Sequence, residues 1–267
     1  MVIPCIDMKI ILIGAGNLAT QLAVALQKKG MTPAYIYSRT RESAEQLSER
    51  LRDVPHSTDI SRVPTDGDLY IFAVKDSALL DLVSRMSANR GLWVHTAGSM
   101  DMEVFAPYTA RYGVFYPMQT FSKERVTDFD DIPIFVEANH TNDTERLQEL
   151  AGRLSTKVYE ATSEQRKYLH LAAVFACNFS NHLYALCDRI LSEHGLPFET
   201  MLPLIRETAA KVADMPPAQA QTGPAIRYDK NVIDKQMALL SDPTMRQIYD
   251  LMSRSIHETN KHQKQRL

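Results

Sequence analysis

A glycine-rich turn near the start of the chain constrains the fold more than any other feature of the sequence. The apolar, β-branched run at residues 9–13 predicts a buried parallel strand. The amphipathic stretch at residues 18–29, which ends before Gly30, predicts a helix. Between them stands a GxGxxA pattern, and a strand–GxGxxA–helix unit is typical of dinucleotide-binding βαβ folds.

The residues of this turn form the first part of a predicted cofactor site. They are Gly14, Ala15, Gly16, Asn17, Leu18 and Ala19. The first glycine permits a tight turn, and the second lets the backbone approach a pyrophosphate, which then contacts N–H groups at the start of the helix. Ala19 is small enough for close packing of helix on strand. The alternative is an ordinary strand–turn–helix, but the chain has only 10 glycines and two fall at these offsets, which favours the cofactor site.

The end of the second predicted strand, at residues 34–37, distinguishes NADP from NAD. Sites for NAD usually place a carboxylate here to bind the ribose 2′-hydroxyl, whereas this chain has none before Glu42. Arg39 offers a planar, permanently charged guanidinium suited to a 2′-phosphate, and Ser38 and Thr40 add hydroxyl groups. The sequence therefore predicts NADP(H). A solvated arginine at a helix start is the alternative for Arg39.

Two later strand ends complete the predicted cofactor site, because ligands of open α/β sheets bind beyond the carboxyl ends of strands. The strands are expected at residues 69–74 and 92–96. The contacts expected there are Ala73, Val74, Lys75 and Ser77 after the first strand, and Thr96, Ala97 and Gly98 after the second, with Ser99 facing the substrate. Helix capping and turn formation are the alternative for both segments.

Strands alternate with helices up to about residue 160, which predicts an α/β fold with a Rossmann-type, doubly wound parallel sheet. The rest of the chain has no convincing strand. Residues 163–193 run without Pro or Gly and predict a helix of about 45 Å. We therefore expect an NADP-binding Rossmann domain at 1–160 and an all-α domain for substrate binding and dimerisation at 161–267.

Charge and cysteine usage narrow the class of protein further. The net charge of −2, from 30 basic and 32 acidic side chains, gives no electrostatic reason to expect nucleic acid or an anionic membrane as a partner. No apolar run reaches the 18 or so residues of a membrane span, and the first residues do not resemble a signal peptide. Cys5, Cys177 and Cys187 form neither a metal-binding spacing nor a disulfide framework. We expect a cytoplasmic protein with reduced thiols and no metal.

Several motifs resemble those of known families. GAGNLA, YSRT, FAVKDSAL and HTAGS in the first half resemble the N-terminal domains of pyrroline-5-carboxylate reductases and F420-dependent NADP oxidoreductases. YPMQTF at 116–121, HLAAVFACNF at 170–179 and TGPAIR at 222–227 resemble Rossmann-like proteins with a helical domain of unknown function, DUF2520. That resemblance implies an NADP-binding domain followed by an all-α domain that is often dimeric. The DUF2520 family tends to follow this arginine with Gly or Asn and then Asp, whereas Tyr228 precedes Asp229 here.

The predicted long helix carries two candidates for chemistry. His170 is a candidate general acid for a carbonyl or imine, since the intrinsic pKa of histidine lies near neutrality, and Asn178 is a candidate for orienting a substrate. A histidine of the core or of a dimer interface and a hydrogen-bonded helix contact are the respective alternatives. Gln119 and Arg227 are further predicted substrate contacts. Arg227 would bind a carboxylate, or else be a solvated loop residue.

These observations lead to two hypotheses. The first is an NADP(H)-dependent oxidoreductase that reduces a C=N or C=O bond of a small molecule and forms a homodimer through its helical domain. The second is a non-catalytic NADP-binding sensor or interaction module, because no residue is an unambiguous proton donor.

Overall fold

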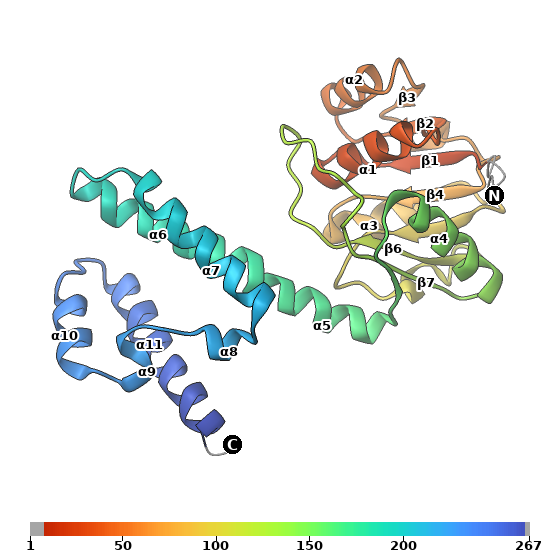
Figure 1. Cartoon of the computed structure of the whole chain (residues 1–267). Coiled ribbons are helices and arrows are strands. Elements are labelled where there is room, and N and C mark those ends of the chain that lie inside the picture. The colour runs from red at the N-terminus through yellow and green to blue at the C-terminus, as the bar shows by residue number, and fades with distance from the viewer. Residues whose placement is uncertain (1–7, 265–267) are drawn as a thin grey trace. The chain divides into compact units, whose positions relative to one another are not determined.

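The computed structural model describes residues 8–264 and contains two compact units, which meet between Cys177 and Asn178 (Figure 1). We call residues up to 177 the N-terminal unit and the remainder the helical unit. The domain boundary predicted near residue 160 coincides with the end of the last strand and stays a prediction. Cys5 lies outside the described residues, and Cys177 and Cys187 are free thiols. Within the described residues, no helix is long and apolar enough to cross a membrane.

An eight-stranded sheet forms the centre of the N-terminal unit, in the order β3-β2-β1-β4-β5-β6-β7-β8. The strands are β1(Ile10–Ile13), β2(Tyr35–Tyr37), β3(His56–Ser57), β4(Leu69–Phe72), β5(Leu92–His95), β6(Tyr112–Pro117), β7(Ile134–Ala138) and β8(Val158–Glu160). The predicted doubly wound sheet is confirmed with one correction, because β7 runs antiparallel to β6. Residues 118–131 between them contain no helix, and a parallel connection would need a crossover of that kind.

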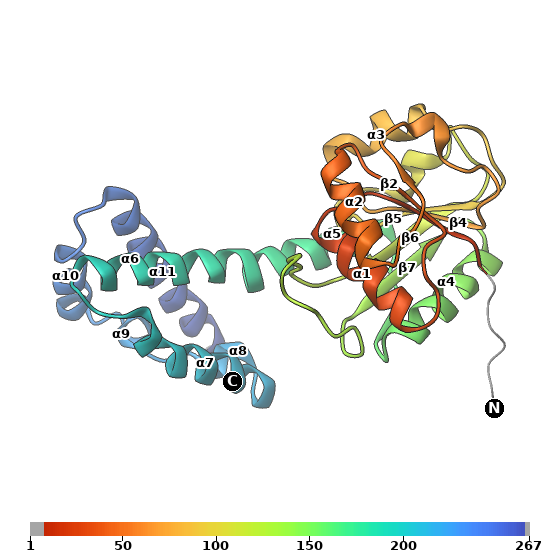
Figure 2. The ribbon, with the colours of Figure 1, turned by 90° about the horizontal axis from the view of Figure 1, so that it is seen from above.

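Helices cover both faces of this sheet (Figure 2). They are α1(Asn17–Lys28), α2(Arg41–Arg50), α3(Asp76–Ser84) and α4(Thr141–Leu154), with the short helices η1(Ile60–Arg62) and η2(Met102–Phe105). Strand β1 shows why its sequence is apolar throughout. Ile10 and Leu12 pack with Leu22 of α1 on one face, while Ile11 and Ile13 join the cluster that contains the buried residues of α3 on the other.

The long helix predicted at 163–193 is present, but it is not a uniform α-helix. It consists of α5(Ser163–Ala173), a π-helical segment η3(Val174–Phe179) and α6(Ser180–Glu193). A capping box between Thr162 and Gln165 begins α5. The π-helical turns contain more residues than α-helical turns, so faces assigned on a 3.6-residue repeat do not continue from α5 into α6.

The helical unit continues with helices of different lengths. They are η4(Phe198–Met201), α7(Leu202–Asp214), α8(Pro217–Ala220), α9(Pro224–Arg227), α10(Lys230–Ala238) and α11(Pro243–Lys264). Tyr228 ends α9 in the left-handed conformation, with φ of 52°, which is the conformation that suits Gly or Asn. A Gly or Asn at this position would adopt that conformation with less strain than the tyrosine does.

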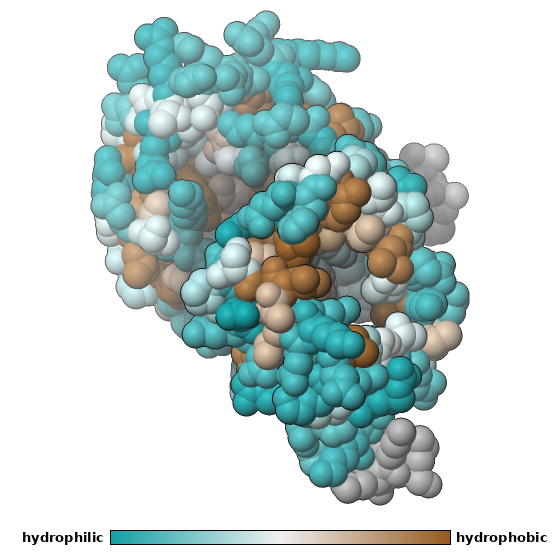
Figure 3. Space-filling model, turned by 90° about the vertical axis from the view of Figure 1, so that its left-hand side faces the viewer, coloured by the Kyte–Doolittle hydropathy of each residue, from teal (hydrophilic) through white to brown (hydrophobic). Residues whose placement is uncertain are grey.

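Few apolar residues of the helical unit are buried. Among the described residues of this unit, the buried hydrophobic side chains are Ala225, Ile233 and Met245. Neither α6 nor α7 contains a buried residue. Hydrophobic side chains instead lie on the surface (Figure 3), and the large ones include Leu183, Ile190, Leu196, Leu204, Val212, Leu239 and Leu251.

Candidate functional site

The glycine turn after β1 fits closely against its neighbours. Gly14 has φ of +126°, and a Cβ added to it would collide with the carbonyl group of Ala73 at the end of β4. The Gly14 amide donates a hydrogen bond to the Tyr37 carbonyl at 2.7 Å, at the end of β2. The turn therefore requires a glycine and brings the carboxyl ends of β1, β2 and β4 together.

The start of α1 is suited to an anion. Gly16 caps the helix without a side-chain hydrogen bond, and the first turn contains no acidic residue. A Cβ at Gly16 would meet no atom within 4 Å, so the space beside the helix end is open. Exposed N–H groups and the positive end of the helix dipole favour a bound phosphate at such a position.

A cavity of about 220 Å³ lies at these strand ends and gathers most of the predicted cofactor residues. Those that line it are Gly14, Ala15, Gly16, Ser38, Arg39, Thr40, Ala73, Val74 and Lys75. Tyr37, Ser43 and Lys123 also line it and were not predicted.

Seven predicted cofactor residues do not line the cavity: four from the glycine turn and α3, and Thr96, Ala97 and Gly98 after β5. Asn17 donates from Nδ2 to the Phe121 carbonyl at 3.1 Å, and Ala19 is fully buried in the core. Leu18 packs partly buried against the same core, and Ser77 is exposed in the first turn of α3. Their predicted cofactor roles are untested.

The cavity is positively charged. Arg39, Lys75 and Lys123 line it, and none of the three forms an ion pair with a described residue. No acidic side chain in the described part of the chain lines the cavity. Uncompensated cations around an open helix N-terminus attract a polyanion, and the arginine matches a phosphate geometrically.

Lys123 reaches the cavity because α1 and α2 hold the loop that carries it. Gln21 of α1 donates from Nε2 to the Ser122 carbonyl at 2.7 Å and accepts from the Thr127 amide at 3.2 Å. Arg50 of α2 donates to the Lys123 carbonyl at 2.9 Å. The buried Gln21 thus anchors both arms of the loop, which fixes where its lysine lies.

A second group of predicted residues follows β5. Thr96 is buried and its amide donates to the Phe72 carbonyl at 3.2 Å, whereas Ser99 donates to the Asp76 carboxylate at 2.5 Å. Gly98 packs against the His170 ring so closely that an added Cβ would lie 2.6 Å from Nδ1. The structure therefore brings His170 to the loop after β5, which the sequence assigned to the cofactor.

His170 has a partner that was not predicted. The hydroxyl of Tyr116, on β6, lies 3.1 Å from Nδ1 of His170. Tyr116 is buried, and burial is the main cause that raises the pKa of its phenol, so the hydroxyl keeps its proton. It can therefore donate to Nδ1, which places the proton of a neutral His170 ring on Nε2.

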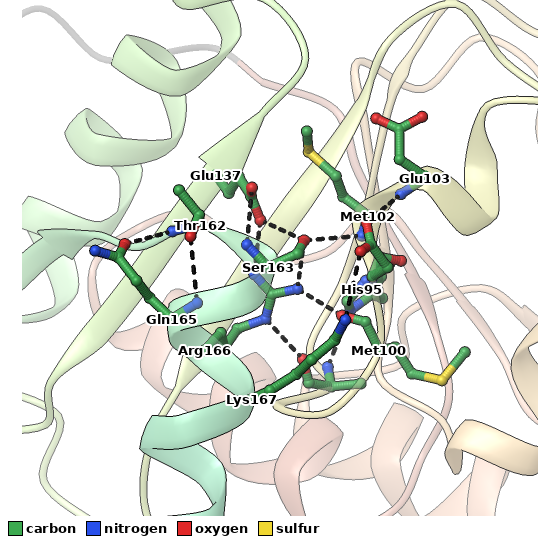
Figure 4. A network of polar contacts seen from close by, with 12 residues as sticks. His95, Met100, Met102, Glu103, Glu137, Thr162, Ser163, Gln165, Arg166 and Lys167 are labelled. Carbon is green, nitrogen blue, oxygen red and sulfur yellow. Dashed lines mark hydrogen bonds and ion pairs between the residues drawn. The ribbon is translucent and has the colours of Figure 1, made fainter.

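Buried polar side chains form hydrogen bonds and ion pairs around the loop after β5 (Figure 4). Arg166 of α5 has no solvent exposure and forms an ion pair with Glu137 of β7 at 2.7 Å. His95 of β5 is also fully buried, and its pKa falls to about 4. Desolvation is the larger cause, and the positive charge of Arg166 adds to it.

Three predicted site residues are not among these groups. Gln119 is exposed, and its Oε1 accepts from the Thr120 amide at 2.8 Å. Asn178 is exposed within the π-helical segment, and Arg227 is exposed at the end of α9. Both belong to the helical unit. The roles proposed for all three stay predictions.

Comparison with known proteins gives the chain its family. The Rossmann-like domain profile matches residues 3–118, and the profile for a domain of unknown function, DUF2520, matches residues 132–256. A candidate NADP oxidoreductase from Bacteroides fragilis is 52% identical, over 94% of this chain and 98% of that one, with a TM-score of 0.89. The chain belongs to the Rossmann-like DUF2520 family.

More distant solved structures share the fold of this DUF2520 protein. A reductive aminase from Aspergillus terreus, in complex with NADPH and ethyl levulinate, is 17% identical over 94% of each chain, with a TM-score of 0.71. A pyrroline-5-carboxylate reductase from Coxiella burnetii is 16% identical over 96% of this chain and 98% of that one, with a TM-score of 0.58. No curated protein matches the sequence.

Proposed function

We propose that this DUF2520 protein binds NADP(H) and reduces a C=N or C=O bond of a small molecule. The observation that carries the proposal is the cavity at the ends of β1, β2 and β4, with its glycine turn and its three cations, none of which pairs with a described acidic side chain. A dinucleotide with a pyrophosphate and a 2′-phosphate has the charge distribution that such a cavity favours.

The residues present fit each anionic part of the cofactor. The open start of α1 after Gly16 would hold the pyrophosphate. Arg39, with Ser43 of α2 beside it, would hold the 2′-phosphate, and the missing carboxylate at the end of β2 removes the usual preference for NAD. Bound NADPH supplies the hydride; orientation and the proton come from the protein.

His170 is the proton donor of this proposal. Its ring lies against Gly98, at the loop after β5, and the hydroxyl of Tyr116 fixes its orientation. As an imidazolium, the ring would donate its Nε2 proton to the oxygen or nitrogen of the reduced bond. The neutral ring that remains would then accept the Tyr116 hydroxyl at Nδ1. Tyr116 thus acts on the donor by setting its tautomer and ring position.

The family relationships support reduction of a C=N bond in particular. Structures with this fold include a reductive aminase and a pyrroline-5-carboxylate reductase. At this level of sequence identity, the two structures support a shared fold and nothing more. The reaction class is our inference from the activities of those two enzymes and from the His170–Tyr116 pair.

A thermal shift series with NADP⁺, NADPH and NAD⁺ tests the cofactor, and NADPH oxidation across cyclic imines, oxo acids and amine–ketone pairs tests the reaction. We expect stabilisation by NADP⁺ and NADPH above that by NAD⁺, and turnover of an imine. Absence of stabilisation contradicts cofactor binding. Tight binding without turnover across the panel instead favours a non-catalytic sensor.

Arg39→Ala tests how the cofactor is distinguished from NAD. Removing charged hydrogen bonds to the 2′-phosphate should weaken NADP⁺ binding by roughly 1.5–3 kcal/mol and leave NAD⁺ binding nearly unchanged. Isothermal titration of both ligands measures the difference. An equal loss for the two ligands contradicts this role of Arg39.

We infer that the helical unit forms a homodimer. The few buried hydrophobic side chains among its described residues, and the absence of any in α6 and α7, leave it short of the apolar burial that a unit of this size needs. A second copy offers the same apolar surface and forms a closed, symmetric interface. Light scattering with size exclusion should give twice the chain mass, and a monomer contradicts the inference.

A further inference from the structure

Arg166 is held in a way that ties α5 to the loop after β5. Among the described residues it is the arginine with no solvent exposure. Its Nε donates to the Ala97 carbonyl at 3.2 Å, and Nη2 donates to the Met100 carbonyl at 2.5 Å. Burying a guanidinium is costly unless its donors are satisfied, so each of these bonds contributes to keeping it there.

The charge of Arg166 is balanced on its other side. Nη1 pairs with the Glu137 carboxylate at 2.7 Å, and the same carboxylate accepts from the Ser163 amide at 2.9 Å and hydroxyl at 2.7 Å. Nη2 also donates to the Ser163 hydroxyl at 3.1 Å. Glu137 and Ser163 therefore fix the guanidinium, and its remaining donors act on the loop.

The loop backbone is held from two directions. His95 accepts from the Ala97 amide at Nδ1 and its Nε2 lies 3.3 Å from the Asp101 carbonyl. Ala97 thus has its N–H bound by one buried side chain and its C=O by another. The Met102 amide donates to Ser163 at 3.1 Å, which fixes the far end of the loop. Figure 4 shows these contacts converging from β5, β7 and α5.

The residue after Ala97 is Gly98, against which His170 packs. Arg166 and His170 are four residues apart within the regular α-helix α5, so they lie on the same side of it. One helix therefore contributes both the anchor of the loop and the imidazole that contacts it. The spacing between loop and imidazole depends on the length and fork of the arginine side chain.

We propose that Arg166 is a positioning residue that fixes the loop 97–100 for the nicotinamide half of the cofactor and sets the distance of His170 from it. The inference rests on the proposed NADP(H) function. Arg166 itself has no solvent exposure, so it would act on the cofactor only through the loop.

Binding of two ligands to Arg166→Lys tests the proposal. A lysine keeps the charge beside Glu137 but lacks the fork that spans two carbonyl groups. NADPH contains the nicotinamide half, whereas 2′,5′-ADP contains only the adenosine half with its 2′-phosphate. We expect the NADPH affinity to fall about tenfold, as for loss of one to two net hydrogen bonds, and the 2′,5′-ADP affinity to stay within about twofold.

Arg111→Lys is the matched control. Arg111 also bridges a carboxylate, that of Asp143, and a backbone carbonyl, that of Arg90, but at the opposite end of β5 and β6. It should lose thermal stability without changing the ratio of the two affinities. If Arg166→Lys does not fold, Ser163→Ala replaces it, because this change removes the hydroxyl shared by Arg166 and the Met102 amide. Ser163→Ala should lower the NADPH affinity more than the 2′,5′-ADP affinity, by a smaller factor than Arg166→Lys.

Each outcome decides the matter. Equal losses for both ligands in Arg166→Lys, or no loss for either, overturn the positioning role. The same split in Arg111→Lys overturns it too, because the effect would then follow stability. A wild-type protein that binds neither ligand overturns the proposed function itself, and this role falls with it.

Discussion

The two units bury their apolar residues very differently. In the N-terminal unit, β1 is buried on both faces and each face has its own cluster of apolar side chains. In the helical unit, the described helices α6 and α7 bury no residue, and leucines such as Leu204 and Leu251 are more than 60% exposed. The N-terminal unit buries its apolar residues within itself, whereas the helical unit leaves large apolar side chains exposed, and the proposed second copy would cover them.

The largest expected effect that tests this difference comes from placing a charged residue on the apolar surface of the helical unit. If a second copy covers it, Leu204→Glu and Leu251→Glu each bury a carboxylate and should weaken the dimer by about 3 kcal/mol. Light scattering across a dilution series measures this. Leu80→Glu on α3, at a site 52% exposed in the N-terminal unit, is the control and should change stability by about 0.5 kcal/mol or less. Equal, small effects at all three sites would contradict the dimer.

The glycine turn offers the next test, on the side of the N-terminal unit. Gly14→Ala should destabilise the fold by about 3 kcal/mol, because the methyl group collides with the Ala73 carbonyl at a positive φ. Gly30→Ala shares the positive φ but has open space, so it should cost about 1 kcal/mol. Urea unfolding measures both. Similar losses would show that backbone strain, and not the contact with β4, dominates at Gly14.

Acid should loosen the N-terminal unit through His95. Its pKa is lowered from 6.5 to about 4 in the folded state, so the neutral form is favoured by folding and its contribution is complete above pH 6.5. As the pH falls from 6.5 towards 4, the unfolded chain binds a proton that the folded one does not, and about 3 kcal/mol is lost. Besides Arg166, the charged groups facing the ring are Asp76 and Asp101.

His95→Asn removes the titrating group and should flatten this decline between pH 6.5 and 4, as measured by urea unfolding at each pH. His194, in the helical unit, is exposed to solvent. His194→Asn is therefore the control, and it should keep the decline that His95→Asn removes. If the free energy of unfolding still declines between pH 6.5 and 4 in His95→Asn, titratable groups other than His95 cause the decline.

The smallest predicted effect concerns Lys123. Lys123→Met should weaken NADP⁺ by about 1 kcal/mol and NAD⁺ less, because the ammonium lines the cavity beside Ser43 at the end proposed for the 2′-phosphate. Lys28→Met, on an exposed lysine at the end of α1, is the control for net charge. Titration at low and high salt measures both. An equal loss of affinity for NADP⁺ and NAD⁺ would indicate that Lys123 contacts the pyrophosphate and not the 2′-phosphate.

Local patterns in the sequence predicted the features that depend on neighbouring residues. Periodicity and turn chemistry predict the strand, glycine turn and helix at residues 9–29. The place of Arg39 directly after a strand predicts that it lies at the cavity. The antiparallel direction of β7 was not predicted, because the sequence of a strand does not determine whether it pairs parallel or antiparallel with its neighbour. The π-helical segment likewise depends on packing that a 3.6-residue pattern ignores.

Contacts between distant residues account for what was missed at the site. Tyr116 and His170 are 54 residues apart, and Lys123 reaches the cavity because Gln21, about 100 residues earlier, holds its loop. Arg166 looks in the sequence like an ordinary polar residue of an amphipathic helix. Its burial depends on Glu137 arriving from β7, which nothing in the helix sequence indicates.

The contact between Gly98 and His170 has a consequence for the history of the family. Any side chain at position 98 would overlap the imidazole, so neither position can change freely while the other is kept. A homologue that acquires alanine at 98 must have a smaller residue than histidine at 170, or a helix displaced from the sheet. The two positions should therefore be inherited together, and lineages that lose the histidine should be the ones in which the glycine drifts.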